Sequence, residues 1–105
     1  MFARTDPFSN AAECLRVLAH PDRLRIVDQL IRRQLTVGDL AETIGLAPAV
    51  TSGHLRLLQR CGLLRPERKG RTVTYVVAEP CLKKIMSCIT ERFIGPKKKT
   101  NEDSQ

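Results

Sequence analysis

Apolar residues recur every three or four positions in the first third of the chain, a spacing that predicts amphipathic helices. The pattern predicts a first helix over about residues 9–19 and a second over about residues 21–33. The apolar positions that define them are Ala12, Leu15, Leu18, Leu24, Val27, Leu30 and Ile31. His20 and Pro21 separate the two helices. Because proline suits the first turn of a helix, we interpret His20 as the residue that caps the second one.

Two further helices, joined by a tight turn, are predicted next. Thr36 can cap the third helix, and Gly45 can end it because glycine readily adopts the left-handed conformation. Pro48 opens a fourth helix, which Gly62 ends. The candidate inward positions of this fourth helix are Val50, Leu55, Leu57 and Leu58. Two helices joined in this way, the second rich in Ser, Thr, His and Arg, are typical of a helix-turn-helix.

After the fourth helix the apolar pattern alternates, which predicts strands over residues 63–68 and 72–77 joined by a turn at residues 69–71. Pro66 has no amide proton to donate, so the first strand is expected at the edge of its sheet. A last helix is predicted from Pro80, with Leu82, Ile85, Met86, Ile89 and Phe93 on its apolar side. We therefore expect a mainly α fold with a small β-hairpin (α+β), a winged helix-turn-helix with the element order α-α-α-α-β-β-α.

Positive charge is concentrated in one part of the chain. Eighteen Lys and Arg stand against eleven Asp and Glu, a net charge of +7. Residues 47–77 hold six basic residues and one acid, Glu67, so +5 of this charge lies on the fourth helix and the hairpin. Such a surface suits the phosphates of a nucleic acid. The chain has no Trp, one Tyr and three Phe, too few to favour stacking on single strands, so double-stranded DNA is the expected partner.

The candidate DNA contacts are the polar and basic side chains of the fourth helix and hairpin. They are Thr51, Ser52, His54, Arg56, Arg60, Arg68, Lys69 and Arg71. Arg56 can bind a guanine edge, with a phosphate contact or a surface ion pair as alternatives. The hairpin cations are expected to reach the minor groove or flanking phosphates. Gly53 is unusual inside a helix, where glycine costs about 1 kcal/mol relative to alanine, and a close approach of the DNA backbone would account for it.

Other kinds of activity find little support in the sequence. It contains no phosphate-binding loop, hydrolase nucleophile motif or zinc-protease motif, so we do not expect an enzyme. Four cysteines without a Cys-x-x-Cys pair and two histidines do not match a zinc finger or a histidine-built metal site. No apolar run is long enough to span a membrane, and no secretory signal begins the chain, so we expect a cytoplasmic protein without a membrane partner.

Four ordered segments resemble motifs of the ArsR/SmtB family of bacterial winged-helix repressors. Residues 18–26, LAHPDRLRI, resemble its LAHPTRLRIL opening. Residues 40–46, 54–63 and 69–75 resemble its LAEALGL, HLRLLREAGLV and REGRRVYY motifs, and the resemblance spans about residues 9–93. It implies a homodimer held by the first and last helices, with two recognition helices in successive major grooves of operator DNA. It also implies repression that an effector, often a metal ion, relieves.

These patterns divide the chain into three expected parts. Residues 1–8 form an N-terminal arm, and residues 9–94 form the winged helix-turn-helix DNA-binding and dimerisation domain. Residues 95–105 form a polar tail that we expect to be disordered.

The residues of this chain do not match the metal sites that the resemblance implies. Thr36 and Gly38 stand where the family's thiol-type site has cysteines, and of its last-helix zinc site only Cys81 can bind a metal. Cys61 resembles one cysteine of a cadmium- and lead-sensing branch, but its partner position is Leu57. The sequence therefore indicates a regulator whose effector it does not name.

The cysteines are the candidate effector site. Cys61 would need a second thiol from Cys81, Cys88 or the other subunit to hold a thiophilic metal ion, the one cofactor the sequence suggests. Cys81 and Cys88 lie on one face of the last helix, where Arg92 can make Cys88 sensitive to oxidants. The alternative is that these cysteines, and Cys14, only pack as small apolar residues.

The function that these observations favour is a sequence-specific double-stranded DNA-binding transcriptional regulator, a homodimeric repressor released from its operator by an effector. One alternative makes it a thiol-based metal or redox sensor acting through Cys61, Cys81 and Cys88. Another is a winged helix used as a protein-interaction module, which the concentrated positive charge disfavours.

Overall fold

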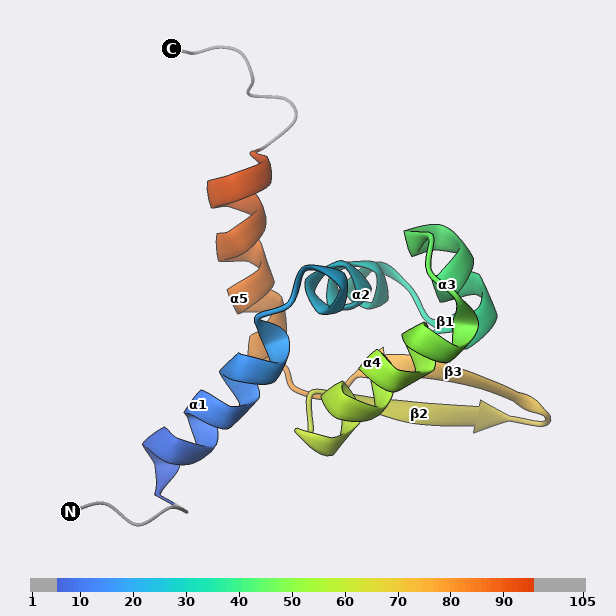
Figure 1. Cartoon of the computed structure of the whole chain (residues 1–105), viewed down its shortest axis with the longest axis horizontal. Coiled ribbons are helices and arrows are strands. Elements are labelled where there is room, and N and C mark those ends of the chain that lie inside the picture. The colour runs from blue at the N-terminus through green and yellow to red at the C-terminus, as the bar shows by residue number, and fades with distance from the viewer. Residues whose placement is uncertain (1–5, 96–105) are drawn as a thin grey trace.

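The computed structural model describes residues 6–95, and it confirms a winged helix-turn-helix (Figure 1). In chain order the elements are α1 (Pro7–Leu18), α2 (Pro21–Arg32), β1 (Leu35–Thr36), α3 (Val37–Ile44), α4 (Pro48–Arg60), β2 (Leu64–Lys69), β3 (Thr72–Val77), α5 (Cys81–Ile89) and η1 (Thr90–Ile94), a π-helical turn. The predicted element order is thus completed by β1 and η1. The polar tail from residue 96 and the first five residues of the predicted arm lie outside the described residues.

Side-chain caps determine where several helices begin. Thr36 Oγ1 accepts a hydrogen bond from the amide of Asp39 at 3.1 Å, and Gly45 ends α3 with φ 76°, so both predicted ends of this helix are confirmed. Helix α1 begins at Pro7, two residues earlier than predicted. The cause is Asp6, whose carboxylate accepts hydrogen bonds from two amides of the first turn at 2.8 and 2.9 Å.

The hairpin belongs to a three-stranded antiparallel sheet in the order β1-β3-β2. β1 has two residues, too few to show an alternating pattern in the sequence, and it is extended because it pairs with the free edge of β3. β2 contains Pro66 and lies at the other edge, as predicted.

The last helix changes its hydrogen bonding near its end. In η1 the amide of Gly95 donates to the carbonyl of Thr90 at 2.7 Å, a bond that spans five residues instead of four. Gly95 has φ 80°, a conformation that suits glycine, and it ends the helix as predicted.

The core lies around α2, which contacts α1, α3, α4, α5 and β3. In Figure 1, α1 and α5 project to one side of α2, while α3, α4 and the sheet lie on the other. The buried apolar residues are Leu18, Ile26, Val27, Leu30, Leu35, Leu40, Leu55, Leu58, Leu64, Leu82 and Met86. Within residues 6–95 we find no helix with the length and apolar character of a membrane span.

The inward face of α4 differs from the prediction by one position. Leu55 and Leu58 are buried as expected, but Val50 is 49% exposed and Thr51 is fully buried in its place. Thr51, Leu55 and Leu58 follow the spacing i, i+4, i+7 of one helix face, whereas Val50 lies about 100° away from Thr51. Thr51 therefore occupies the inward position despite its hydroxyl group, whereas apolar character alone favoured its neighbour Val50.

Candidate nucleic-acid interface

Five exposed cations lie on α4 and on the β2–β3 hairpin, which extends beyond the body of the domain in Figure 1. They are Arg56, Arg60, Arg68, Lys69 and Arg71. Within residues 6–95 none of the five forms an ion pair, whereas Arg65 on the same hairpin pairs with Glu67 at 2.8 Å. Their charge is therefore available to a phosphate backbone.

The hairpin turn carries its cations at the tip. Lys69 pairs with Thr72 in the strand register, and Gly70 between them has φ 63°, which permits the tight turn. Arg68, Lys69 and Arg71 are all exposed. This arrangement holds three positive side chains at the end of the hairpin that lies farthest along the strands from the core.

The polar residues predicted on α4 do not all face outward. Thr51 is fully buried, and its hydroxyl donates to the carbonyl of Ala47 at 3.0 Å, so its expected role as a DNA contact is wrong. Ser52 is half-buried, while Arg56 and Arg60 are exposed. These three residues remain candidate contacts on this helix.

Gly53 lies on the outward side of α4, because it is two positions away from both Thr51 and Leu55, which are buried. A Cβ atom added at Gly53 would have nothing within 4 Å of it. The fold therefore leaves room for a larger residue at this position. The sequence pointed to the glycine as unusual, but only the structure shows that packing does not require it.

His54 faces the junction of α1 and α2 and not the outward side of α4. Its Nδ1 accepts a hydrogen bond from Arg23 Nε at 3.1 Å, and Arg23 also donates to the carbonyl of Val17 at 2.9 Å. This half-buried side chain therefore joins α4 to α1 and α2, and the DNA contact expected at His54 stays a prediction. Burial, then the positive charge of Arg23, lower the pKa of His54.

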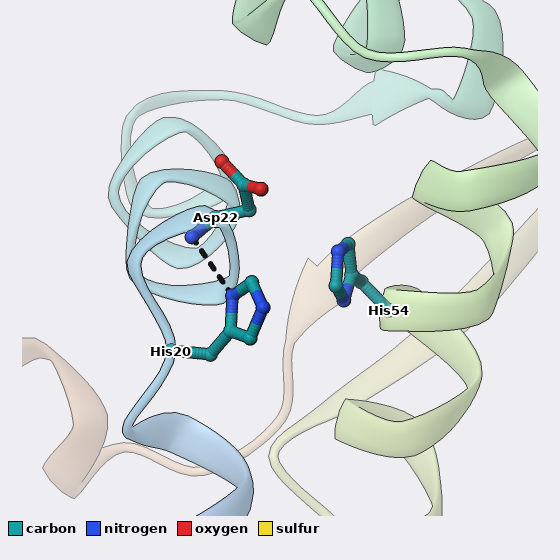
Figure 2. Close-up of side chains that lie close together, drawn as sticks. All are labelled: His20, Asp22 and His54. Carbon is teal, nitrogen blue, oxygen red and sulfur yellow. Dashed lines mark hydrogen bonds between the residues drawn. The ribbon is translucent and has the colours of Figure 1, made fainter.

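His20 and Asp22 come close to His54, as Figure 2 shows. The His20 and His54 rings lie 4.8 Å apart between centroids. His20 Nδ1 accepts from the amide of Asp22 at 3.1 Å, which confirms His20 as the cap of α2. The two histidines, which seemed too few for a metal site, thus share one cluster with a carboxylate.

This cluster has the wrong proton arrangement for a metal. Nδ1 of both His20 and His54 accepts an N–H hydrogen bond, so the proton of each neutral ring is on Nε2. A metal-binding histidine instead offers one bare nitrogen and donates its other N–H to an acceptor. The guanidinium of Arg23 adds a positive charge, and Asp22 already pairs with Arg25 at 2.6 Å. The cluster fits a structural bridge between helices.

The structure brings Cys61 together with Cys14 and exposes Cys81 and Cys88. Cys14 Sγ lies 3.6 Å from the carbonyl oxygen of Cys61. Burial, then interaction with Cys14, raise the pKa of the Cys61 thiol. No cysteine among the described residues belongs to a group of three metal-binding side chains, so the expected help for Cys61 from Cys81 and Cys88 is not found within the chain.

A second surface is apolar. Large apolar side chains between 38% and 80% exposed lie on α1, α5 and η1: Phe8, Leu15, Ile85, Phe93 and Ile94. A groove of about 380 Å³ separates the start of α2 from the end of α5 and from η1, with Leu24, Met86 and Phe93 among its lining residues. Exposed apolar area of this kind usually marks an interface.

Comparison with known proteins identifies the chain's relatives. A model of the arsR family of bacterial regulatory proteins matches residues 20–65. The HTH-type transcriptional regulator NmtR of Mycobacterium tuberculosis is 42% identical over 67 residues, which are 64% of this chain and 56% of NmtR. The nodulation protein NolR of Rhizobium meliloti is 32% identical over 83 residues, 79% of this chain and 68% of NolR.

The fold is shared with a solved regulator. HlyU from Vibrio cholerae superposes with a TM-score of 0.78 at 26% identity, covering 86% of this chain and 98% of HlyU. The aligned part of this chain spans little more than half the length of NmtR, at 56%. The expected ArsR/SmtB resemblance is confirmed by sequence and by fold. The chain therefore belongs to the ArsR family of bacterial regulatory proteins, a family of regulators and not of enzymes.

Proposed function

We propose that this protein is a homodimeric, sequence-specific regulator that represses transcription by binding double-stranded operator DNA in the cytoplasm. The observation that carries the proposal is the set of five exposed cations without ion-pair partners in residues 6–95, placed on the second helix of a helix-turn-helix and on its wing. In this fold α4 enters the major groove and the hairpin lies along the flanking backbone.

The contacts divide into two kinds. Ser52 and Arg56, one turn apart on α4, read base edges, and Arg56 suits guanine because its guanidinium can make two parallel hydrogen bonds. Arg60 and the hairpin cations Arg68, Lys69 and Arg71 bind phosphates or the minor groove. The first kind supplies specificity, and the second supplies most of the salt-dependent affinity.

A second copy of the chain covers the apolar surface of α1, α5 and η1. An operator read by two recognition helices requires such a dimer, with half-sites about one helical turn apart. The exposed Leu15 and Phe93 contribute to this interface, and continuous apolar contact between two chains would remove them from water.

Fluorescence anisotropy tests the proposal directly. The DNA upstream of the gene and a shuffled duplex of equal composition are titrated with protein at several salt concentrations. Specific binding that weakens with salt supports the proposal. Replacing Arg68, Lys69 and Arg71 by alanine should lower the affinity for both duplexes. The slope of log affinity against log salt concentration should also become shallower, by the equivalent of up to about three phosphate contacts. The matched control is Arg32→Ala, an exposed cation on α2 paired with Asp28.

Equal affinity for both duplexes, or no binding, would overturn the proposal. Either result would favour the alternative, in which the winged helix is a protein-interaction module. Binding that resists replacement of the three wing cations but fails in the Arg32 variant would place the DNA on another surface.

A further inference from the structure

One arginine side chain joins three helices beside the histidine cluster. Arg23 belongs to α2, and its Nε donates to His54 Nδ1 on α4 at 3.1 Å. Its Nη1 donates to the carbonyl of Val17 on α1 at 2.9 Å. We call these two hydrogen bonds the Arg23 bridge. Since α1 also carries the exposed Leu15, the bridge connects a helix of the apolar surface to the helix that holds the candidate base contacts.

The acceptor end of the Arg23 bridge can be titrated. His54 Nδ1 accepts a hydrogen bond only while the ring is neutral, because both nitrogens of a protonated histidine are donors. A proton taken from solvent onto Nδ1 would therefore leave two N–H groups facing each other, each on a positively charged side chain. Histidine is the side chain whose ordinary pKa lies between pH 5 and 8, and the chain contains only His20 and His54.

The groups around His54 oppose its protonation. The His20 ring lies 4.8 Å from the His54 ring, and Figure 2 shows His54 pointing from α4 toward it. Burial, then the charge of Arg23, then His20 lower the pKa of His54. Asp22 acts in the opposite direction, but its carboxylate already pairs with Arg25 at 2.6 Å. In the described part of the chain α1, α3 and β2, which also contact α4, contribute no charged group to this balance. The bridge is therefore closed at neutral pH and opens in acid.

We propose that the proton is an effector of this regulator: protonation of His54 opens the Arg23 bridge and weakens binding to operator DNA. Arg23 is thus a positioning residue, which acts on the DNA through His54 and α4. His54 lies two positions from both Ser52 and Arg56, so a movement of α4 at this point displaces both candidate base contacts. Because a dimer presents two α4 helices at a fixed spacing, loss of the link to α1 worsens the fit to both half-sites. This inference rests on the proposed function.

The DNA test is a pH profile of the full chain. Its affinity for the upstream duplex is measured by anisotropy between pH 7.5 and 5.5 at constant salt, with circular dichroism confirming that the protein stays folded. The affinity should fall at least about fivefold, the scale of one lost hydrogen bond.

Two variants assign this fall to one histidine. His54→Gln should bind as the native chain does at pH 7.5 and show a flat profile, because the glutamine carbonyl accepts from Arg23 and does not titrate. The matched control is His20→Asn, which removes the other histidine and keeps a side chain that can cap α2, so the fall should persist. Arg23→Met should bind weakly at pH 7.5 and lose little more in acid, and His54→Gln decides the question alone if Arg23→Met does not fold.

Three results would overturn the proposal. The first is an affinity that does not change between pH 7.5 and 5.5, and the second is a fall that survives in His54→Gln. The third is an affinity that rises in acid and loses this rise in His54→Gln, since His54 would then contact the DNA itself.

A measurement without DNA separates the bridge from the proposed function. In an NMR titration of the histidine rings, His54 should titrate below its ordinary value of about 6.5, and its pKa should rise in Arg23→Met. An identical titration of His54 in both chains would show that Arg23 does not hold this ring, against the proposal. A chain that passes this test but binds no DNA at pH 7.5 would contradict the proposed function and leave the bridge supported.

Discussion

Replacing Gly53 with alanine should stabilise the folded protein and weaken its binding to DNA. Glycine inside a helix costs about 1 kcal/mol relative to alanine, because the unfolded chain loses more conformational freedom. The added Cβ has nothing within 4 Å, so no clash offsets that gain. For a domain of this size 1 kcal/mol corresponds to a rise in Tm of about 4–8 °C, measured by thermal denaturation followed by circular dichroism.

The effect on DNA follows from the position of Gly53 on α4. It lies opposite the buried face of the helix and between Ser52 and His54, so an added methyl group points toward the groove. If the groove approaches the helix closely here, the methyl group costs about 1–3 kcal/mol, a loss of roughly five- to 150-fold in affinity measured by anisotropy. The control is Gly38→Ala on α3, where the nearest atom to an added Cβ is Thr36 Oγ1 at 4.0 Å. This variant should not change DNA affinity.

Two results would refute this reasoning. A lower Tm for Gly53→Ala would mean that the fold, and not the DNA, requires glycine at this position. A stabilised variant with unchanged DNA affinity would mean that the helix does not approach DNA closely at Gly53.

Three further predictions concern the bridge, the buried threonine and the apolar surface. Folding lowers the pKa of His54, so the stability that this side chain contributes is present above its unfolded pKa of about 6.5 and is lost as the pH falls below that value. The free energy of unfolding, measured in urea at pH 7.5 and 5.5, should therefore fall less on acidification in His54→Gln than in the native chain. Thr51→Val should change the free energy of unfolding by about 1 kcal/mol or less and leave DNA affinity unchanged, because the side chain is buried. Ser52→Ala should weaken specific DNA binding. A large loss of DNA affinity in Thr51→Val would contradict the burial of its side chain. Leu15→Asp should shift the protein toward monomers in sedimentation velocity, and an unchanged dimer would place the interface elsewhere.

Local signals predicted most of the elements because they act over a few residues. A threonine cap, a glycine with positive φ and a proline at a first turn each bind or restrict their immediate neighbours, and α3 begins and ends where Thr36 and Gly45 predicted. The two-residue β1 carried no such signal, since its conformation depends on pairing with β3. The early start of α1 did have a local signal, the capping carboxylate of Asp6, but the spacing of apolar residues does not reveal it.

The candidate site divides in the same way. Charge is a property of residue type, so the cations of α4 and the hairpin could be identified without coordinates, and all five are exposed. The orientation of uncharged and weakly polar residues depends on helix phase, and a shift of one position moved Thr51 into the core and Val50 out of it. The hydrogen bond of His54 could not be predicted for a related reason, because its partner Arg23 lies on another helix.

The sequence by itself determined the winged-helix class, the family and the location of the positive charge, because periodicity, caps and ionisable side chains are encoded within short segments. The tertiary structure alone decided which side chains meet across long separations: His54 with Arg23, and Cys14 with Cys61. Such contacts depend on how helices pack around α2, and residues of either pair carry no local mark of their partner.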